Sequence, residues 1–147
     1  VKFFQLRLKK IRKKKLLQIA KRIRKISHKH KVKLIINDDY NLVSKTKADG
    51  CHMGLSDGSI EVAKNKLKKK ILGVTCHNSI KLAERAIKYN VNYLAFGSFY
   101  KSKLKPNAIK ADIGILKQKK NIKTLTKPTK TFYFWSLLDG KTKHTEE

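Results

Sequence analysis

The chain has 147 residues, of which 37 are lysine or arginine and 10 are aspartate or glutamate, so its formal net charge is +27 at pH 7. The length suits one domain, and 40% hydrophobic residues are enough for a core, which argues against wholesale disorder. No apolar run approaches the roughly 20 residues of a membrane span, and the first residues do not form a signal peptide. Two cysteines make neither a disulfide framework nor a zinc site. We therefore expect a soluble, cytoplasmic, globular chain.

The positive charge is spread along the chain rather than gathered in one patch. Only five of the basic residues are arginines, although arginine is the preferred residue for bidentate contacts with phosphates and bases. Lysines on solvated helix faces account for most of this charge, and the sequence contains no RNA- or DNA-binding motif. A basic module that binds nucleic acid is therefore the least favoured function, and we do not expect a nucleic-acid partner.

Short apolar runs alternate with longer amphipathic ones, a pattern typical of strands followed by helices in a parallel sheet. The predicted strands are Phe3–Leu6, Val32–Ile36, Cys51–Gly54, Ile71–Thr75 and Val91–Gly97. The predicted helices contain the apolar positions Leu16, Ala20, Ile23 and Ile26, then Ile60, Ala63 and Leu67, then Ile80, Ala83 and Ile87 after an N-cap at Ser79, with a last helix from about Asn107 to Lys119.

Polar residues at the strand ends decide between an open doubly wound sheet and a barrel. No glycine-rich dinucleotide-binding turn follows the first strand, which disfavours the doubly wound fold. Functional groups at the carboxyl ends of successive strands are instead typical of a (β/α)8 barrel. We therefore predict an α/β fold of the (β/α)8 TIM-barrel type with about five to six βα units visible. The end residues are Gln5 and Arg7, Asn37 and Asp38, His52 and Asp57, Thr75 and His77, and Gly97 and Ser98.

The scarce acidic residues are concentrated, because four of the ten lie within residues 38–57. Asp38 closes one predicted strand and Asp57 follows the next, so both carboxylates can point at one place. Two carboxylates with open coordination positions suit Mg²⁺, which keeps waters and takes further ligands from substrate phosphates. For Asp39 and Asp49 we favour structural roles as helix caps or turn residues.

Basic residues lie where a diphosphate on that metal would need them. Arg7 and Lys9 end the first strand, and Lys105 follows the last. The period of two along a strand predicts that Gln5, Arg7 and Lys9 share the face that lines the barrel interior.

Other candidate groups carry weaker predictions. His77 is a candidate acid or base, although a single histidine at a strand end is more often a structural residue. His52 is interpreted in the same way, as a packed side chain rather than a ligand. Cys51 and Cys76 are expected to be buried, reduced thiols.

Several motifs in order resemble the thiamine-phosphate synthase family over roughly residues 1–118. They are Gln5-Leu6-Arg7-Leu8-Lys9, Ile35-Ile36-Asn37-Asp38, Ala48-Asp49-Gly50-Cys51-His52-Met53-Gly54, Leu72-Gly73-Val74-Thr75-Cys76-His77, and Phe96-Gly97-Ser98 with Ser102 and Lys105-Pro106. The resemblance implies a (β/α)8 barrel that joins 4-amino-5-hydroxymethyl-2-methylpyrimidine diphosphate to hydroxyethylthiazole phosphate and releases diphosphate. In the family's mechanism the diphosphate leaves first, and the thiazole nitrogen then attacks a pyrimidine carbocation.

The resemblance also implies roles for individual residues, because the positions match the family's motifs. Asp38 and Asp57 would hold Mg²⁺, and Gln5 would contact the pyrimidine ring. Ser102 would lie in the loop facing the thiazole phosphate. The diphosphate would be bound by Arg7, Lys9, Asn37, Thr75 and Lys105, with Arg7, Lys9, Thr75 and Lys105 assisting its departure as the catalytic residues.

The chain departs from the family pattern in ways that indicate an incomplete copy. Leu104 replaces a residue that usually carries a hydroxyl, and the sequence contains no Gly-Gly phosphate-binding turn. We predict a partial barrel over residues 1–120, with the first and last βα units missing, and a divergent tail over residues 121–147 that matches no unit. Open sheet edges would then allow self-association.

Two further readings remain open at this point. One is an inactive fragment of the synthase. The other is a related thiazole tautomerase, which would use His77 as an acid or base without Mg²⁺. Retention of Asp38, Asp57 and the Gln5-Arg7-Lys9 motif favours the synthase, whose partners are small phosphorylated substrates.

Overall fold

Strands and helices alternate along the chain in a computed structural model, which describes residues 1–54, 56–99, 109–115 and 130–133. The elements in order are β1 (Phe3–Leu6), α1 (Lys13–Lys29), β2 (Lys33–Asn37), α2 (Tyr40–Thr46), β3 (Gly50–Met53), α3 (Ile60–Leu67), β4 (Ile71–His77), α4 (Ile80–Lys88), β5 (Tyr93–Phe96) and β6 (Lys130–Tyr133).

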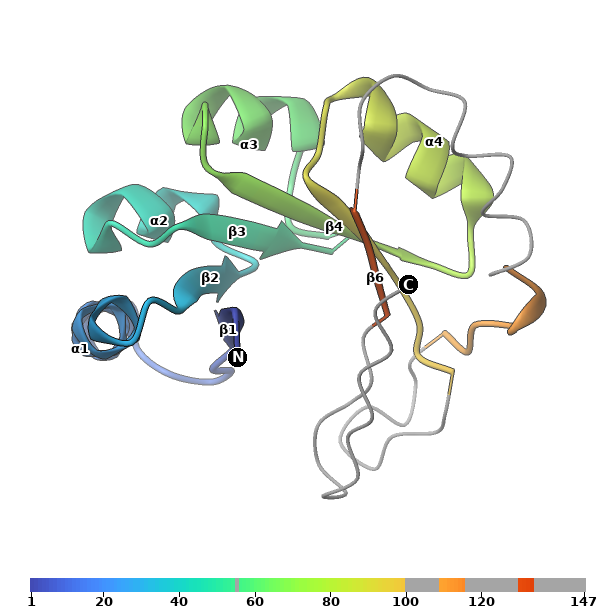
Figure 1. The fold of residues 1–147 in the computed structure, drawn as a ribbon. Coiled ribbons are helices and arrows are strands. Elements are labelled where there is room, and N and C mark those ends of the chain that lie inside the picture. The colour runs from blue at the N-terminus through green and yellow to red at the C-terminus, as the bar shows by residue number, and fades with distance from the viewer. Residues whose placement is uncertain (55, 100–108, 116–129, 134–147) are drawn as a thin grey trace.

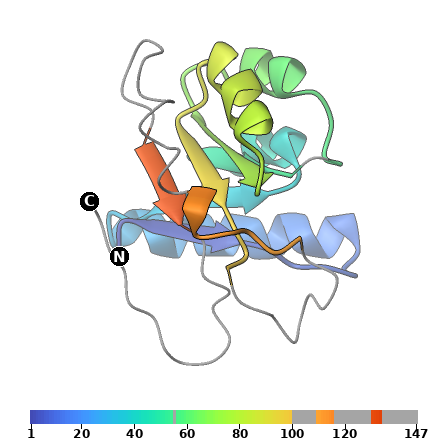
Figure 2. The ribbon, with the colours of Figure 1, turned by 90° about the vertical axis from the view of Figure 1, so that its right-hand side faces the viewer.

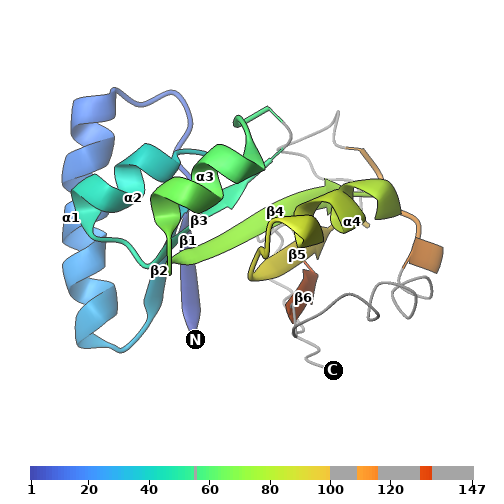
Figure 3. The ribbon, with the colours of Figure 1, turned by 90° about the horizontal axis from the view of Figure 1, so that it is seen from above.

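All neighbouring strands of the sheet are parallel, and their order in the sheet, β1-β2-β3-β4-β5-β6, follows the sequence. Crossovers between parallel strands are almost always right-handed, so a sheet that grows in one direction places all its helices on one face. Figures 1 and 3 show this arrangement, with α1 to α4 along one side of a curled sheet. The fold is thus α/β, with a parallel sheet curled like part of a barrel wall.

The predicted strands within residues 1–99 are confirmed, with ends that differ by at most two residues. The three predicted helices in that range are also confirmed. Helix α2 was not predicted, because its seven residues are too few to establish a helical period. The predicted helix at about 107–119 lies mostly outside the described residues, which include only a short helical turn at Gly114 and Ile115.

Strand β6 comes from the segment in which no element was predicted. It pairs in parallel with β5, and Figure 2 shows the two strands side by side. No helix in the described part of the chain is long and apolar enough to cross a bilayer.

The core lies between the sheet and the helices, because alternate strand residues point toward α1 to α4. Small helix residues such as Ala20, Ala63 and Ala83 are fully buried and let the helices approach the strands closely. The strand residues of this core are Leu6, Leu34, Ile36, Cys51, Met53, Leu72, Val74, Cys76, Leu94 and Phe96. The remaining strand residues point to the opposite face, which we call the inner face.

The two cysteines belong to this core, as expected. Both are free, and burial raises the pKa of each thiol to about 12; nearby carboxylates add to the shift for Cys51. The thiols therefore stay protonated near neutral pH and are poor nucleophiles.

Strand β1 lies at one end of the strand order, so one of its edges has no partner strand among the described residues. Nearby Phe3, Phe4 and Leu8 are 38%, 45% and 42% exposed. An unpaired edge flanked by apolar side chains is a surface prone to association, and self-association through this edge stays a prediction.

Two polar residues hold the amino-terminal edge of the sheet by the same device. The backbone N–H of Asp49 donates to the carbonyl oxygen of Leu34 (2.9 Å), and a carboxylate oxygen of Asp49 accepts from the N–H of Leu34 (2.8 Å). Asn92 makes the same exchange with Leu72, at 2.8 and 2.9 Å. We call each pair of exchanged hydrogen bonds a bracket. Because Asp49 and Asn92 directly precede strands, the two brackets align β3 with β2 and β5 with β4.

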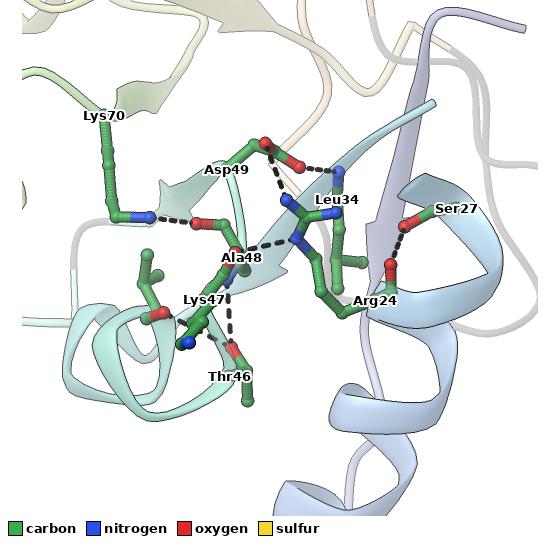
Figure 4. A network of polar contacts seen from close by, with 9 residues as sticks. Arg24, Ser27, Leu34, Thr46, Lys47, Ala48, Asp49 and Lys70 are labelled. Atoms are coloured by element: carbon green, nitrogen blue, oxygen red, sulfur yellow. Dashed lines mark hydrogen bonds and ion pairs between the residues drawn. The ribbon is translucent and has the colours of Figure 1, made fainter. Parts of the chain in front are cut away.

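The Asp49 bracket is also joined to the helix layer, as Figure 4 shows. Arg24 of α1 lies 3.6 Å from the Asp49 carboxylate and donates through Nε to the carbonyl oxygen of Lys47 (2.7 Å). Lys70, just before β4, donates to the carbonyl oxygen of Ala48. Asp49 therefore has a structural role, as predicted, but it joins two strands and a helix rather than capping a helix or closing a turn.

We predict that Asp49→Ala lowers the free energy of unfolding by about 1–3 kcal/mol, because the buried N–H of Leu34 would lose its acceptor. Chemical denaturation measures this change. Asp49→Asn keeps an acceptor oxygen and should cost less. The control is Glu84→Ala, an exposed acid on α4, whose effect should stay within about 0.5 kcal/mol. Equal losses for Asp49→Ala and Glu84→Ala would contradict the bracket.

Candidate functional site

Those predicted site residues that the structure describes gather at the carboxyl ends of the parallel strands, beginning with the loop after β1. Strand β1 ends at Leu6, so the prediction that Arg7 and Lys9 continue its inner face was wrong, and only Gln5 lies within the strand. Lys9 still reaches the next strand end, where its Nζ lies 3.4 Å from a carboxylate oxygen of Asp38. Arg7 is exposed and makes no hydrogen bond or ion pair with any described residue.

Asp38 and Asp57 form a carboxyl pair between the ends of β2 and β3. Asp38 has a φ of 70°, a left-handed conformation that aspartate tolerates better than most residues, and its N–H donates to the carbonyl oxygen of His52 (2.8 Å). Asp57 accepts from the N–H of Gly54 (2.5 Å). The two residues, predicted from sequence to point at one place, are therefore brought together.

Burial and the proximity of Asp38 raise the pKa of Asp57. Burial is the largest cause, the hydrogen bond from Gly54 opposes it, and both a hydrogen bond and charge repulsion from Asp38 add to it. Lys9 partly compensates as a nearby cation. The folded chain thus holds two acidic groups close enough for their negative charges to repel each other.

The donor set of this pair suits a hard divalent cation that keeps open positions. Carboxylate oxygens are preferred Mg²⁺ ligands, and the described residues contain no group of three or more His, Cys, Asp or Glu side chains that would enclose a metal. Asp39 is not part of the pair, because its side chain caps α2 by accepting from the N–H groups of Asn41 and Leu42. Its predicted role as a helix cap is confirmed.

Five side chains on the inner face form what we call the polar row, Gln5, Asn37, His52, Thr75 and Tyr93. Gln5 Nε2 donates to Asn37 Oδ1 (2.7 Å), and Asn37 is the register neighbour of His52. His52 Nε2 lies 2.7 Å from Thr75 Oγ1, and His52 Nδ1 lies 2.9 Å from the Tyr93 hydroxyl. The row therefore spans five strands, and it contains the predicted ligands Gln5, Asn37 and Thr75.

A glycine makes room for the last member of the row. A Cβ on Gly73 would lie 1.9 Å from Tyr93 Cζ, so the tyrosine ring crosses the space that any larger residue would fill. The ring then stacks on His52 with a centroid distance of 5.6 Å and an interplanar angle of 18°.

His52 was predicted to be a packed residue and Tyr93 was not singled out. His52 is indeed 6% exposed, but its two ring nitrogens join Thr75 to Tyr93. The signal in the sequence was the shared face, since positions 52, 75 and 93 occupy inner-face positions of neighbouring strands.

The remaining candidates are placed as follows. His77 ends β4 with a φ of 51°, next to a register shift between Thr75 and His77 in the pairing of β4 with β5. Gly97 and Ser98 follow β5. Ser102 and Lys105 lie outside the described residues, so their predicted roles stay predictions.

Sheet and site together define a parallel α/β protein whose polar site is built at the carboxyl ends of its strands. The thiamine monophosphate synthase family model matches residues 1–130, and the chain belongs to this family.

Relatives and a solved structure agree with this assignment. A thiamine-phosphate synthase from Pelagibacter ubique is 51% identical over 125 residues, which cover 85% of this chain and 60% of the relative. One from Alcanivorax borkumensis is 41% identical over 100 residues, covering 67% and 46%. In fold, the chain matches a thiamine phosphate pyrophosphorylase from Pyrococcus furiosus with a TM-score of 0.77 and 23% identity, covering 92% of this chain and 63% of that one. The chain thus spans at most about 60% of the length of these two synthases.

We predict that Asp57→Asn stabilises the chain by about 0.5 kcal/mol at pH 7 without divalent cations, the scale of a partly exposed charge interaction. The variant removes the repulsion with Asp38 but keeps an acceptor for the N–H of Gly54. Because folding raises the pKa of Asp57, protonation favours the folded state. The advantage of the variant should therefore shrink as the pH falls through that pKa. Denaturation at several pH values measures this, and a destabilised variant at pH 7 would contradict it.

Proposed function

We propose that this chain carries the metal- and diphosphate-binding part of a thiamine-phosphate synthase. This transferase condenses 4-amino-5-hydroxymethyl-2-methylpyrimidine diphosphate with hydroxyethylthiazole phosphate to give thiamine phosphate and diphosphate. The observation that carries the proposal is the Asp38–Asp57 carboxyl pair with Lys9 beside it, at the strand ends of a chain that belongs to the family.

In this proposal Asp38 and Asp57 hold Mg²⁺. The raised pKa of Asp57 supports the assignment, because a divalent cation would relieve the repulsion that contributes to it. When bound, Mg²⁺ would neutralise negative charge that develops on the departing diphosphate. Lys9, already paired with Asp38, would contact a diphosphate on the same metal.

The other side chains would bind and orient the pyrimidine substrate. Thr75 and Asn37 offer a hydroxyl and an amide on the inner face, and Arg7 and Lys105 would add positive charge from loops. Gln5 would contact the pyrimidine ring, and Ser102 would face the thiazole phosphate. Cationic and polar donors aimed at a leaving group stabilise its charge in the transition state, which favours departure of the diphosphate before the thiazole nitrogen attacks. This chemistry requires no protein nucleophile.

The proposal includes the (β/α)8 barrel as the complete fold, of which this chain forms part. Sequential parallel strands with helices on one face support it, as does the match in fold to the Pyrococcus furiosus protein. The cytoplasmic location expected from the sequence remains a prediction.

The thiazole tautomerase alternative would rely on His77 rather than on the carboxyl pair. It predicts that His77→Asn abolishes turnover while removal of Mg²⁺ has no effect. The synthase predicts the opposite order of sensitivity, so the same two measurements separate the candidates.

Activity is tested by mixing the two phosphorylated substrates with Mg²⁺ and measuring thiamine phosphate. We expect product from a barrel in which the lacking units are supplied from the Pelagibacter ubique relative, and less or none from this chain alone. No product from the completed barrel would overturn the assignment.

In that completed barrel we predict that Arg7→Ala lowers kcat/KM by about 100-fold or more, because a cation aimed at the leaving group is lost. Arg85→Ala is the matched control, since it removes the same charge from the exposed surface of α4. Equal kinetics for the two variants would show that Arg7 does not contribute to catalysis.

Mg²⁺ binding is tested on this chain by thermal unfolding. At a concentration about ten times the dissociation constant, Mg²⁺ should stabilise the chain by about 1.4 kcal/mol. Asp57→Asn should lose this gain, whereas Glu84→Gln, which removes one charge from α4, should keep it. The same gain in all three proteins would place the ion elsewhere.

A further inference from the structure

His52 links two hydroxyl groups through its two ring nitrogens. The side chain is buried on β3, with Nε2 at 2.7 Å from Thr75 Oγ1 and Nδ1 at 2.9 Å from the Tyr93 hydroxyl. Tyr93 is also 7% exposed and is held against His52 by ring stacking across Gly73. Thr75 is the least buried of the three, so the chain of contacts runs from the interior toward the surface of the inner face.

The direction of these hydrogen bonds follows from the proposed role of Thr75, which is to bind a diphosphate oxygen. Phosphate oxygens only accept hydrogen bonds, so Thr75 can bind a diphosphate only by donating its single hydroxyl proton. The short contact with His52 must then be one in which Nε2–H donates to Thr75 Oγ1. In a neutral imidazole Nδ1 is then the acceptor, and it receives the Tyr93 O–H.

The environment of Tyr93 supports this direction. Burial, with a smaller contribution from Cys51, raises the pKa of the Tyr93 hydroxyl well above its usual range, so it keeps its proton near neutral pH. The stacked geometry also restricts rotation of both rings, which keeps the two nitrogens in line with their partners.

We propose that His52 and Tyr93 are positioning residues that fix the Thr75 hydroxyl as a hydrogen-bond donor toward the diphosphate. This inference deepens the proposed function and rests on it. The relay runs from Tyr93 O–H to His52 Nδ1 and from His52 Nε2–H to Thr75 Oγ1. Neither His52 nor Tyr93 needs to touch the substrate, and no proton is transferred.

The first test is spectroscopic and needs no turnover. ¹⁵N NMR of the full chain, with His52→Gln used to assign its signals, should show His52 as the neutral Nε2–H tautomer at pH 7. Tyr93→Phe removes the donor to Nδ1 and should give a mixture of tautomers. An Nδ1–H tautomer, or an imidazolium, in the wild-type chain would overturn the proposed direction.

The second test is a double-mutant cycle on the binding of inorganic diphosphate with Mg²⁺, measured by calorimetry on the full chain. Thr75→Val should weaken binding about tenfold, whereas Thr75→Ser should restore most of it. Tyr93→Phe should weaken binding about threefold in the wild-type background and have no effect in the Thr75→Val background. Tyr89→Phe, which removes a hydroxyl at the end of α4, is the matched control.

The outcomes separate this inference from the proposed function. If the wild-type chain fails to bind diphosphate with Mg²⁺, the proposed site is wrong, and the proposed role of Thr75 is wrong as well. If the wild-type chain binds but Tyr93→Phe acts equally in both Thr75 backgrounds, the relay is wrong while the site remains. His52→Gln, which retains an amide donor near the position of Nε2, should bind more tightly than His52→Asn, and the reverse order would also contradict the relay.

Discussion

The register of the parallel strands is the constraint on which every functional side chain depends. Successive side chains in a strand point to opposite faces, so a slip of one residue would move His52 from the inner face into the helix layer. Asp49 and Asn92 prevent such a slip, because each exchanges two hydrogen bonds with one residue of the preceding strand. With that register, Asn37, His52, Gly73 and Tyr93 become neighbours across four strands. Contacts at the amino-terminal ends of the strands thus help to determine which side chains lie together at the carboxyl ends.

Electrostatics at the carboxyl edge oppose the charge balance of the whole molecule. In a chain of net charge +27, a carboxylate next to a lysine would be the expected arrangement. Asp38 does have Lys9 beside it, but it also lies close enough to Asp57 for the two carboxyl charges to repel each other. Carboxyl pairs of this kind reduce stability unless a cation is bound, which is why a stabilising substitution at Asp57 is expected to abolish binding.

Much of the fold could be predicted from apolar runs, because the strands are buried on the helix face and the longer helices have a clear period. The pairing of Asp38 with Asp57 followed from their positions after neighbouring strands. The apolar run predicted the end of β1 at Leu6, but the extension of its inner face to Arg7 and Lys9 was wrong, because the strand does not continue past Leu6. The contact of Tyr93 with His52 was missed, because it depends on the space left by Gly73, which lies in a different strand. Side-chain contacts across strands depend on the strand register, which cannot be derived from a single sequence.

The site combines two kinds of support that differ in rigidity. The polar row is held by strands, and His52 and Tyr93 are almost fully buried, so these groups are oriented before any ligand arrives. Arg7 and Lys9 lie in the loop after β1, and the side chain of Lys9 is 60% exposed despite its ion pair. Ordering long exposed side chains costs conformational entropy on binding. In the proposed site the hydroxyl and amide donors on the strands are therefore preformed, whereas ordering the loop cations on a diphosphate would carry an entropic cost that their charge offsets.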